Sequence, residues 1–248
     1  GDVYELNYCV EYFKENTEIK PIELFNVINT KAKSPFSSLL KFKNFYTLCF
    51  SPERFLKKEG SKLISQPIKG TIRKSNNPGE NDSLKATLKA DIKERAENVM
   101  IVDLVRNDLT KSAKTGTIKV EELFAIYEFE TINQMISTVV AEKKDSISNT
   151  EIIKNAFPMG SMTGAPKIRS MEIIEEIEKQ KRGIYAGAIG YFTKEDDFDF
   201  NVVIRSLVYD TDAKYLSLQV GGAITYDSIP EKEWQETKEK VKAIVEEL

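Results

Sequence analysis

The carboxylates of this sequence that are best placed for chemistry come in pairs one helical turn apart. Glu94 and Glu97 are three residues apart in a segment of helical periodicity, and so are Glu233 and Glu236, with Lys240 four residues further on. Residues at these spacings share one face of a helix, where like charges repel each other unless water or a cation separates them. Each pair therefore indicates either a solvated helix face or a hard cation on carboxylates, most plausibly Mg²⁺.

The composition excludes several kinds of site. The 248 residues include no histidine and only two cysteines, Cys9 and Cys49. This rules out histidine-based triads, histidine-ligated metals and four-cysteine zinc sites, and two cysteines without a disulfide framework fit a reducing cytoplasm. The net charge is −3 with both signs interspersed, and no apolar run reaches the ~18 residues of a membrane span. We therefore expect a cytoplasmic protein with no nucleic-acid or membrane partner.

The chain reads as a mixture of strands and helices, an α/β protein large enough for one domain or at most two. Strands are predicted over residues 3–13, 45–50, 62–71, 118–140, 185–192, 198–209 and 216–224. Helices are predicted over residues 21–33, from about 83 past 99, and over 146–154, 168–177 and 227–248. The second of these helices would be capped by Asp82 or Ser83, and the last by Asp227 or Ser228.

A turn of small residues, GSMTGAPK, runs from Gly160 to Lys167 and precedes a predicted helix. Thr163 is the expected cap, and Pro166 suits the first helical turn. The buried stripe of this helix would consist of Ile168, Met171, Ile174 and Ile177. Such a turn can offer free N–H groups to an anion, although a plain cap and tight turn explain it equally well. It is not a nucleotide P-loop, because that motif needs Gly directly before its Lys.

Several segments resemble, in order, those of the chorismate-utilising enzymes. They are GDVYELN at 1–7, SPERF at 51–55, PIKGT at 67–71, ENVMIVDLVRNDL at 97–109, GSMTGAPK at 160–167, YAGAIGY at 185–191 and EWQET at 233–237. The family includes aminodeoxychorismate, anthranilate, isochorismate and salicylate synthases. The resemblance implies one chorismate-binding catalytic domain over residues 1–248, with a two-sheet antiparallel β core flanked by helices. GDVYELN lies inside the family's fold, so we expect this domain to lack its N-terminal part.

The resemblance also implies roles for the residues that match these motifs. Glu97 and Glu236 would bind Mg²⁺ directly, Glu94 and Glu233 would stand beside them, and Lys240 would approach a substrate carboxylate. The other implied substrate-binding residues are Thr71, Gln134, Thr163, Tyr185, Arg205, Gly221 and Gly222.

Two of these assignments have support from the residues themselves. Arg205 lies within a strand predicted to be buried, where an arginine needs a partner such as a bidentate carboxylate. The family's arginine here holds the pyruvyl carboxylate of chorismate, together with a residue matching Tyr185. Gly221 and Gly222 leave backbone N–H groups open to a ligand, which in the family is the ring carboxylate.

Lys69 separates the members of the family. Taken alone, Glu53 and Lys69 would be a surface pair at adjoining strand ends. Aminodeoxychorismate synthases carry lysine at this position, whereas anthranilate synthases carry alanine.

Glu5, which would be a surface residue by itself, replaces the lysine linked to water activation in isochorismate and salicylate synthases. Gln134 replaces a histidine thought to assist loss of the pyruvyl group in anthranilate synthase, unless it is a neutral change at a packing position.

The resemblance therefore implies an Mg²⁺-dependent aminodeoxychorismate synthase component I, acting in para-aminobenzoate and folate biosynthesis. Lys69 would attack the ring, Glu53 would protonate the leaving hydroxyl, and a glutamine amidotransferase subunit would supply ammonia. Anthranilate synthase component I and a non-catalytic chorismate-binding subunit are the alternatives.

Overall fold

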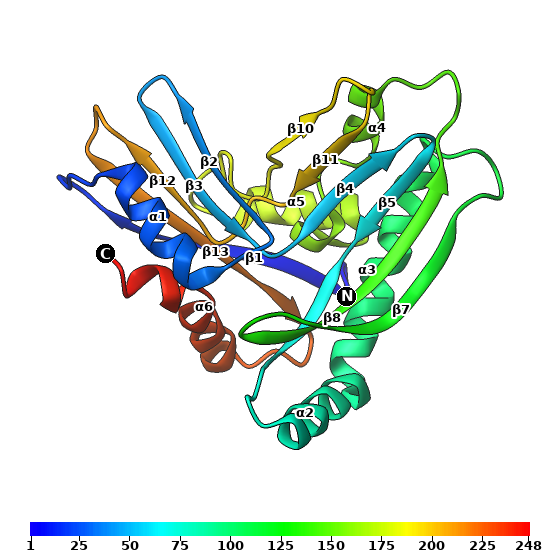
Figure 1. Ribbon diagram of the computed structural model, residues 1–248, viewed down its shortest axis with the longest axis horizontal. Coiled ribbons are helices and arrows are strands. Elements are labelled where there is room, and N and C mark those ends of the chain that lie inside the picture. Colours follow the sequence, from blue (N-terminus) through cyan, green and yellow to red (C-terminus); the bar gives the residue numbers. More distant parts are fainter. The chain divides into compact units, whose positions relative to one another are not determined.

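The computed structural model describes residues 1–248 and consists of two compact units (Figure 1). The first unit contains Gly1–Pro52, Met162–Ile189 and Asn201–Leu248, and the second contains Glu53–Ser161 and Gly190–Phe200. Each unit has its own β-sheet, and the strand pairs in both are antiparallel. The expected α/β fold with two antiparallel sheets and flanking helices is confirmed.

The sheet of the first unit has six strands in the order β2-β3-β12-β13-β1-β9. Their bounds are β1 Glu5–Lys14, β2 Phe36–Phe42, β3 Phe45–Ser51, β9 Gly164–Ala165, β12 Ser206–Asp210 and β13 Tyr215–Thr225. Helices α1 (Pro21–Ala32) and α6 (Pro230–Val245) pack against this sheet and against each other (Figure 1). Helix α5 (Lys167–Ile177) contacts β1 and β9.

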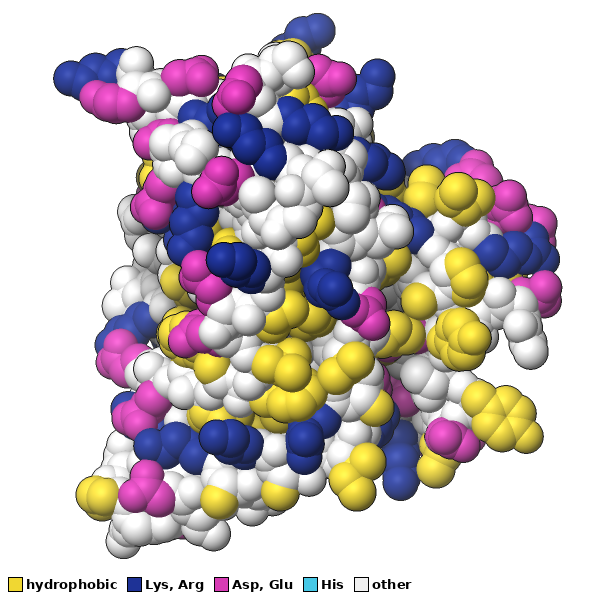
Figure 2. Space-filling view, turned by 90° about the vertical axis from the view of Figure 1, so that its right-hand side faces the viewer, with side chains coloured by type: hydrophobic (Ala, Val, Ile, Leu, Met, Phe, Trp, Pro, Cys, Tyr) yellow, Lys and Arg dark blue, Asp and Glu magenta, His cyan; other side chains and the backbone are white.

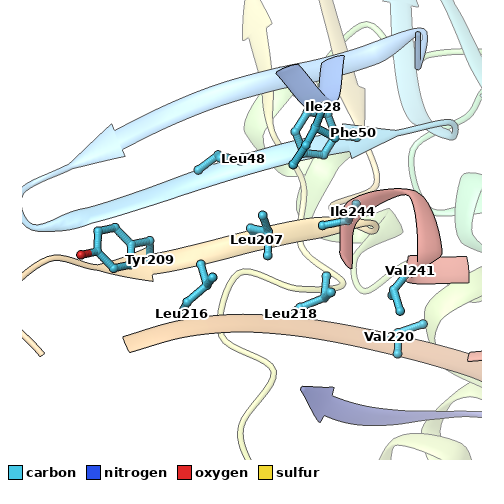
Figure 3. Packing of buried hydrophobic residues seen from close by; sticks show 10 residues of the cluster. All are labelled: Ile28, Leu48, Phe50, Leu207, Tyr209, Leu216, Leu218, Val220, Val241 and Ile244. Carbon is cyan, nitrogen blue, oxygen red and sulfur yellow. The ribbon is translucent and has the colours of Figure 1, made fainter. Parts of the chain in front are cut away.

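The core of the first unit lies between its sheet and helices α1 and α6. Ile28 from α1 and Ile244 from α6 meet alternate residues of β3, β12 and β13, among them Leu48, Leu207 and Leu218 (Figure 3). Side chains alternate between the two faces of a strand, so the residues between these positions point to the opposite face. Helix α6 therefore covers one face of β13, and the alternate residues of β13 point away from this helix.

The sheet of the second unit has seven strands, in the order β10-β11-β4-β5-β8-β6 with β7 also paired to β8. Their bounds are β4 Arg54–Glu59, β5 Lys62–Gln66, β6 Ile68–Arg73, β7 Lys119–Glu128, β8 Ile132–Glu142, β10 Gly190–Phe192 and β11 Phe198–Asn201. The helices are α2 Pro78–Ala90, α3 Ile92–Thr110 and α4 Asn149–Ala156, with a short 3₁₀ turn at Gly160–Met162. Helix α3 packs on β6 and β8.

The long helix predicted from residue 83 is wrong, because the segment forms two helices that meet at Asp91. The Asn77 side chain accepts a hydrogen bond from Glu80 N at 3.1 Å and starts α2, so neither Asp82 nor Ser83 is its cap. The Asp91 carboxylate accepts from Glu94 N at 3.0 Å and starts α3. A capping side chain offers the backbone an alternative to continuing the first helix.

The expected apolar stripe of α5 is also wrong, since Ile168 is 76% exposed and Met171 and Ile177 are exposed too. Thr163 does not cap α5, which begins at Lys167 with Pro166 at the cap position and no capping side chain. Similarly, α6 begins at Pro230 after Ile229, so neither Asp227 nor Ser228 is its cap.

Three predicted strands are interrupted. The strand over 62–71 breaks at Pro67, which lacks an N–H donor for the ladder. Residues 185–189 form a turn rather than a buried strand, and only the exposed β10 follows. The strand over 198–209 breaks into β11 and β12, and Arg205 in the break has φ +51°. The strands predicted over 3–13, 45–50, 118–140 and 216–224 and the helix over 21–33 are found with small shifts.

The charge pattern expected from the sequence is visible on the surface. On the face in Figure 2, Lys and Arg side chains alternate with Asp and Glu side chains around a central group of hydrophobic ones. No helix of the structure combines the length and the apolar character that crossing a membrane would require.

Candidate active site

Strand β6 of the second unit carries Lys69 beside a pair of carboxylates on α3. Lys69 Nζ lies 3.3 Å from Glu97 Oε2, and its side chain is 12% exposed. Gly70, with φ +89°, is packed tightly, because a Cβ there would lie 3.0 Å from the Leu88 side chain and 3.3 Å from Glu94 Oε2. The glycine therefore lets the helices approach β6 closely, and this approach brings Lys69, Glu94 and Glu97 together.

Glu53 immediately precedes β4 and is 7% exposed. Beside it, Arg54 binds the Asp199 carboxylate through Nε at 2.9 Å and Nη2 at 3.0 Å and also donates to Gln66. Arg54 and Gln66 are opposite each other in the β4–β5 hairpin. Both Glu53 and Lys69 are thus shielded, and the alternative of a surface pair is wrong.

Gln134 and Thr71 are partners across the β6–β8 ladder. Gln134 is 2% exposed, and its Nε2 donates to Thr71 Oγ1 at 3.4 Å. The amide thus has a fixed hydrogen-bond partner, and two residues predicted to bind substrate lie together. Glu5, by contrast, is buried in β1 of the first unit, so its expected surface position is wrong.

In the first unit, Tyr185 and Gly221 meet a residue that the sequence analysis missed. A Cβ at Gly221 would overlap the Asn7 side-chain oxygen and lie 3.0 Å from the Tyr185 hydroxyl. Tyr185 is buried, and this burial raises the pKa of its phenol, which therefore stays protonated at neutral pH. Asn7 is buried in β1, but this strand also carries Glu5, Glu11 and Lys14, so its polar type alone did not single it out in the sequence.

Helix α6 places charged residues beside Gly221 and Gly222. Lys240 Nζ donates to the Gly221 carbonyl at 3.0 Å and lies 2.7 Å from the Glu236 carboxylate. Glu233 accepts a hydrogen bond from Ser228 Oγ at 2.8 Å. Gly222 faces this helix, and a Cβ there would have Glu233 Oε2, 3.9 Å away, as its nearest neighbour.

The two glycines should therefore respond differently to substitution. Gly221→Ala forces a side chain into an occupied space, so we expect it to destabilise the protein by about 1–3 kcal/mol. Gly222→Ala meets only ordinary contacts and should change the free energy of unfolding by no more than about 0.5 kcal/mol. Urea unfolding of both variants measures this difference, and equal stability of the two would contradict the packing described for Gly221.

The backbone carbonyls of Thr163 and Arg205 each accept a hydrogen bond within the first unit. Thr163 is buried, and its carbonyl accepts a hydrogen bond from Asn7 N at 2.8 Å. Arg205 is half-buried, and its carbonyl accepts from Phe50 N at 3.1 Å. Arg205 lies between β11 and β12, so its expected position inside a buried strand is wrong.

The carboxylates suit a hard cation by donor type. Neither unit gathers three or more Asp, Glu or Cys side chains into a metal-binding group. In the second unit, burial and then the nearby charge of Glu97 raise the pKa of Glu94. A divalent cation bound between the two carboxylates would remove this electrostatic repulsion. The Mg²⁺ site remains a prediction that these residues fit.

Comparison with known proteins gives the family. The sequence profile described as chorismate binding enzyme matches residues 1–246. Aminodeoxychorismate synthase component 1 of Salmonella typhimurium is 39% identical over 248 residues, which are 100% of this chain and 54% of that protein. Anthranilate synthase component 1 of Aquifex aeolicus is 37% identical over 246 residues, covering 99% of this chain and 49% of that protein.

The fold agrees with a solved structure of the same kind. Anthranilate synthase component I from Streptococcus pneumoniae TIGR4 superposes with a TM-score of 0.87 at 29% identity, over 98% of this chain and 53% of that chain. The chain thus spans about half the length of these relatives. The matched profile covers nearly every residue, and the protein belongs to the chorismate binding enzyme family.

Proposed function

We propose that the protein is an aminodeoxychorismate synthase component I, which converts chorismate and ammonia into 4-amino-4-deoxychorismate. The observation that carries the proposal is Lys69, a shielded amine on β6 held 3.3 Å from Glu97. Relatives named for this activity, in Salmonella typhimurium and Arabidopsis thaliana, are 39% and 40% identical to the chain. An enzyme that attacks a ring through a protein amine needs such a lysine, whereas direct attack by ammonia does not.

In the proposed reaction, the Lys69 ammonium first gives a proton to the Glu97 carboxylate, and the neutral amine then forms a bond to a carbon of the chorismate ring. The 4-hydroxyl group departs as water, taking the proton that Glu53 donates. Ammonia then forms the new bond at C4, the ring carbon that lost the hydroxyl group, while the bond to Lys69 breaks and its electron pair returns to the amine. The ammonium group formed at C4 gives one proton back to the Glu53 carboxylate. Lys69 and Glu53 therefore both finish the cycle ready for another turnover.

Residues of the family's motifs are proposed to orient chorismate. Tyr185 and Arg205 are proposed for the pyruvyl carboxylate, the N–H groups of Gly221 and Gly222 for the ring carboxylate, and Lys240 for added positive charge. Thr71, Gln134 and Thr163 are proposed to complete substrate binding.

Mg²⁺ is the proposed cofactor, with ligands from Glu94 and Glu97 and from Glu233 and Glu236. When bound, it would supply positive charge to the ring carboxylate. Because Lys69 and Lys240 now neutralise Glu97 and Glu236, the ion would have to compete with these amines for the same oxygens.

A glutamine amidotransferase subunit is the proposed source of ammonia. The relatives in Salmonella typhimurium and Escherichia coli are each named component 1 of their synthase, which fits a second, ammonia-supplying component.

Anthranilate synthesis is the second candidate, because relatives named for it are 37% identical to the chain. It requires loss of the pyruvyl group, which a proton-exchanging side chain would assist. Gln134 can donate and accept hydrogen bonds but cannot exchange a proton near neutral pH, and it already donates to Thr71.

We therefore expect no pyruvate to be released from chorismate by the purified protein in the presence of Mg²⁺ and ammonia. Lactate dehydrogenase and NADH, added to the same reaction, detect pyruvate as it forms. Pyruvate added at a known concentration provides the control for the coupling enzyme. Stoichiometric release of pyruvate would replace the proposed reaction by anthranilate synthesis.

A further inference from the structure

A half-buried arginine lies in the loop that follows α5 in the first unit. Arg182 donates from Nε to Glu178 Oε2 at 2.8 Å and from Nη2 to Glu178 Oε1 at 2.6 Å. The two side chains are 16% and 6% exposed, respectively. This is a bidentate pair in a shielded position, the geometry in which a guanidinium and a carboxylate hold each other most firmly.

The same pair binds backbone groups from two distant parts of the chain. Arg182 Nη1 donates to the Met162 carbonyl at 2.6 Å, and Nη2 donates to the Asn7 carbonyl at 2.8 Å. Glu178 Oε1 accepts from Cys9 N at 2.8 Å. One ion pair therefore joins the loop after α5, the segment before β9, and strand β1.

These contacts take the place of a missing strand. Strand β9 pairs with β1 only opposite Glu5 and Leu6, and then the edge of β1 has no further strand beside it. The next backbone groups along that edge, the carbonyl of Asn7 and the N–H of Cys9, are those that Arg182 and Glu178 bind. Side chains thus continue the ladder where the strand ends, which fixes the position of the edge.

Each backbone contact lies next to a residue that the proposed function assigns to chorismate. Met162 precedes Thr163, whose carbonyl accepts from Asn7 N. Tyr185 N donates to the Arg182 carbonyl at 3.0 Å, so the turn carrying Tyr185 begins at the arginine. Cys9 is opposite Gly221 in the β1–β13 ladder.

We propose that Arg182, held by Glu178, is a positioning residue that fixes Thr163 and Tyr185 relative to Gly221 and thereby sets the affinity for chorismate. This inference rests on the proposed function, because it takes these three residues to contact the substrate. The Arg182 side chain is not proposed to contact the substrate, because the hydrogen bonds described above all go to protein atoms.

The test variant replaces both partners, Arg182→Met together with Glu178→Gln. It leaves no buried charge without a partner, and the glutamine oxygen can still accept from Cys9 N. The Met162 and Asn7 carbonyls lose their donor. The matched control is Arg169→Met with Glu172→Gln, which removes an ion pair of 3.0 Å at the surface of α5, the helix that precedes the Arg182 loop.

Amide hydrogen exchange followed by mass spectrometry is the first measurement, and it needs no ligand. We expect faster exchange over residues 162–166 and 185–189 in the test variant than in the wild type, and no change in the control variant. Unchanged exchange in both segments would overturn the positioning role.

Steady-state kinetics with chorismate is the second measurement. We expect kcat/KM to fall by about tenfold to a hundredfold in the test variant, with most of the loss in KM, because the loosened groups bind substrate and transition state alike. The control variant should keep both constants. A KM equal to that of the wild type, in a folded test variant, would overturn the inference.

Arg182→Lys serves if the double variant does not fold. It keeps a positive charge for Glu178, but one ammonium group cannot reproduce the planar arrangement of four hydrogen bonds. The same faster exchange and higher KM are expected, and wild-type values of both would count against the proposal. If the wild type itself fails to bind chorismate, the proposed function falls, and the exchange measurement alone decides whether Arg182 positions these segments.

Discussion

Replacing Lys69 by alanine is expected to abolish formation of aminodeoxychorismate while the protein remains folded. Removing a nucleophile costs on the order of 10³-fold or more in kcat. The fold should survive because Lys93 Nζ, 3.7 Å from Glu97 Oε1, remains as a second cation for that carboxylate. Product formation from chorismate, Mg²⁺ and ammonia is measured by chromatography, and circular dichroism checks the fold.

Lys93 provides the matched control, because it neutralises the same carboxylate without being proposed as a nucleophile. Lys93→Ala should keep activity within a few-fold, whereas Lys69→Ala and Lys69→Arg should both lose it. An arginine keeps the charge beside Glu97 but cannot serve as a neutral amine. Full activity in Lys69→Ala would remove the covalent mechanism and the main reason for preferring this member of the family.

The second large effect concerns Mg²⁺. Glu97→Gln and Glu236→Gln should each weaken the Mg²⁺-dependent binding of chorismate by about tenfold to a hundredfold, because an amide oxygen is a poorer ligand for a hard cation than a carboxylate oxygen. Titration calorimetry with chorismate at several Mg²⁺ concentrations measures this dependence.

Acidic residues on the same two helices serve as controls. Asp103→Asn on α3 removes a carboxylate that pairs with Arg106 at 2.6 Å, and Glu239→Gln on α6 removes one that accepts from Gln235. Neither should alter the Mg²⁺ dependence. Unchanged binding in both Glu97→Gln and Glu236→Gln would show that the carboxylate assignment is wrong.

The elements predicted well are those whose pattern is repeated over many residues. Strands β1, β3 and β13 are rich in apolar and aromatic residues, and helix α1 places Phe25 and Ile28 against the core, so their existence follows from the local sequence. The errors lie at interruptions. Asp91, Pro67 and Arg205 each interrupt an element that the apolar pattern alone would continue. A capping carboxylate decides the outcome at Asp91 and a missing N–H at Pro67, whereas at Arg205 the backbone turns to φ +51°.

Within the candidate site, too, some features could be predicted from local sequence and others could not. The roles of Lys69, Glu97 and Glu236 are assigned from motifs that resemble a known family and stay predictions. The contacts of Asn7 and Arg182 could not be predicted, because these residues are 175 positions apart and no local spacing records their meeting. The exposed Ile168 shows the converse, since helical spacing predicted a buried stripe on α5 that the fold leaves at the surface.

The reaction itself is the most direct test. The purified protein is incubated with chorismate, Mg²⁺ and an ammonium salt, and the products are identified by mass spectrometry. We predict a single product in which an amino group replaces the 4-hydroxyl group and the enolpyruvyl group is retained. Anthranilate and pyruvate among the products, or bound chorismate that stays unchanged, would contradict the account.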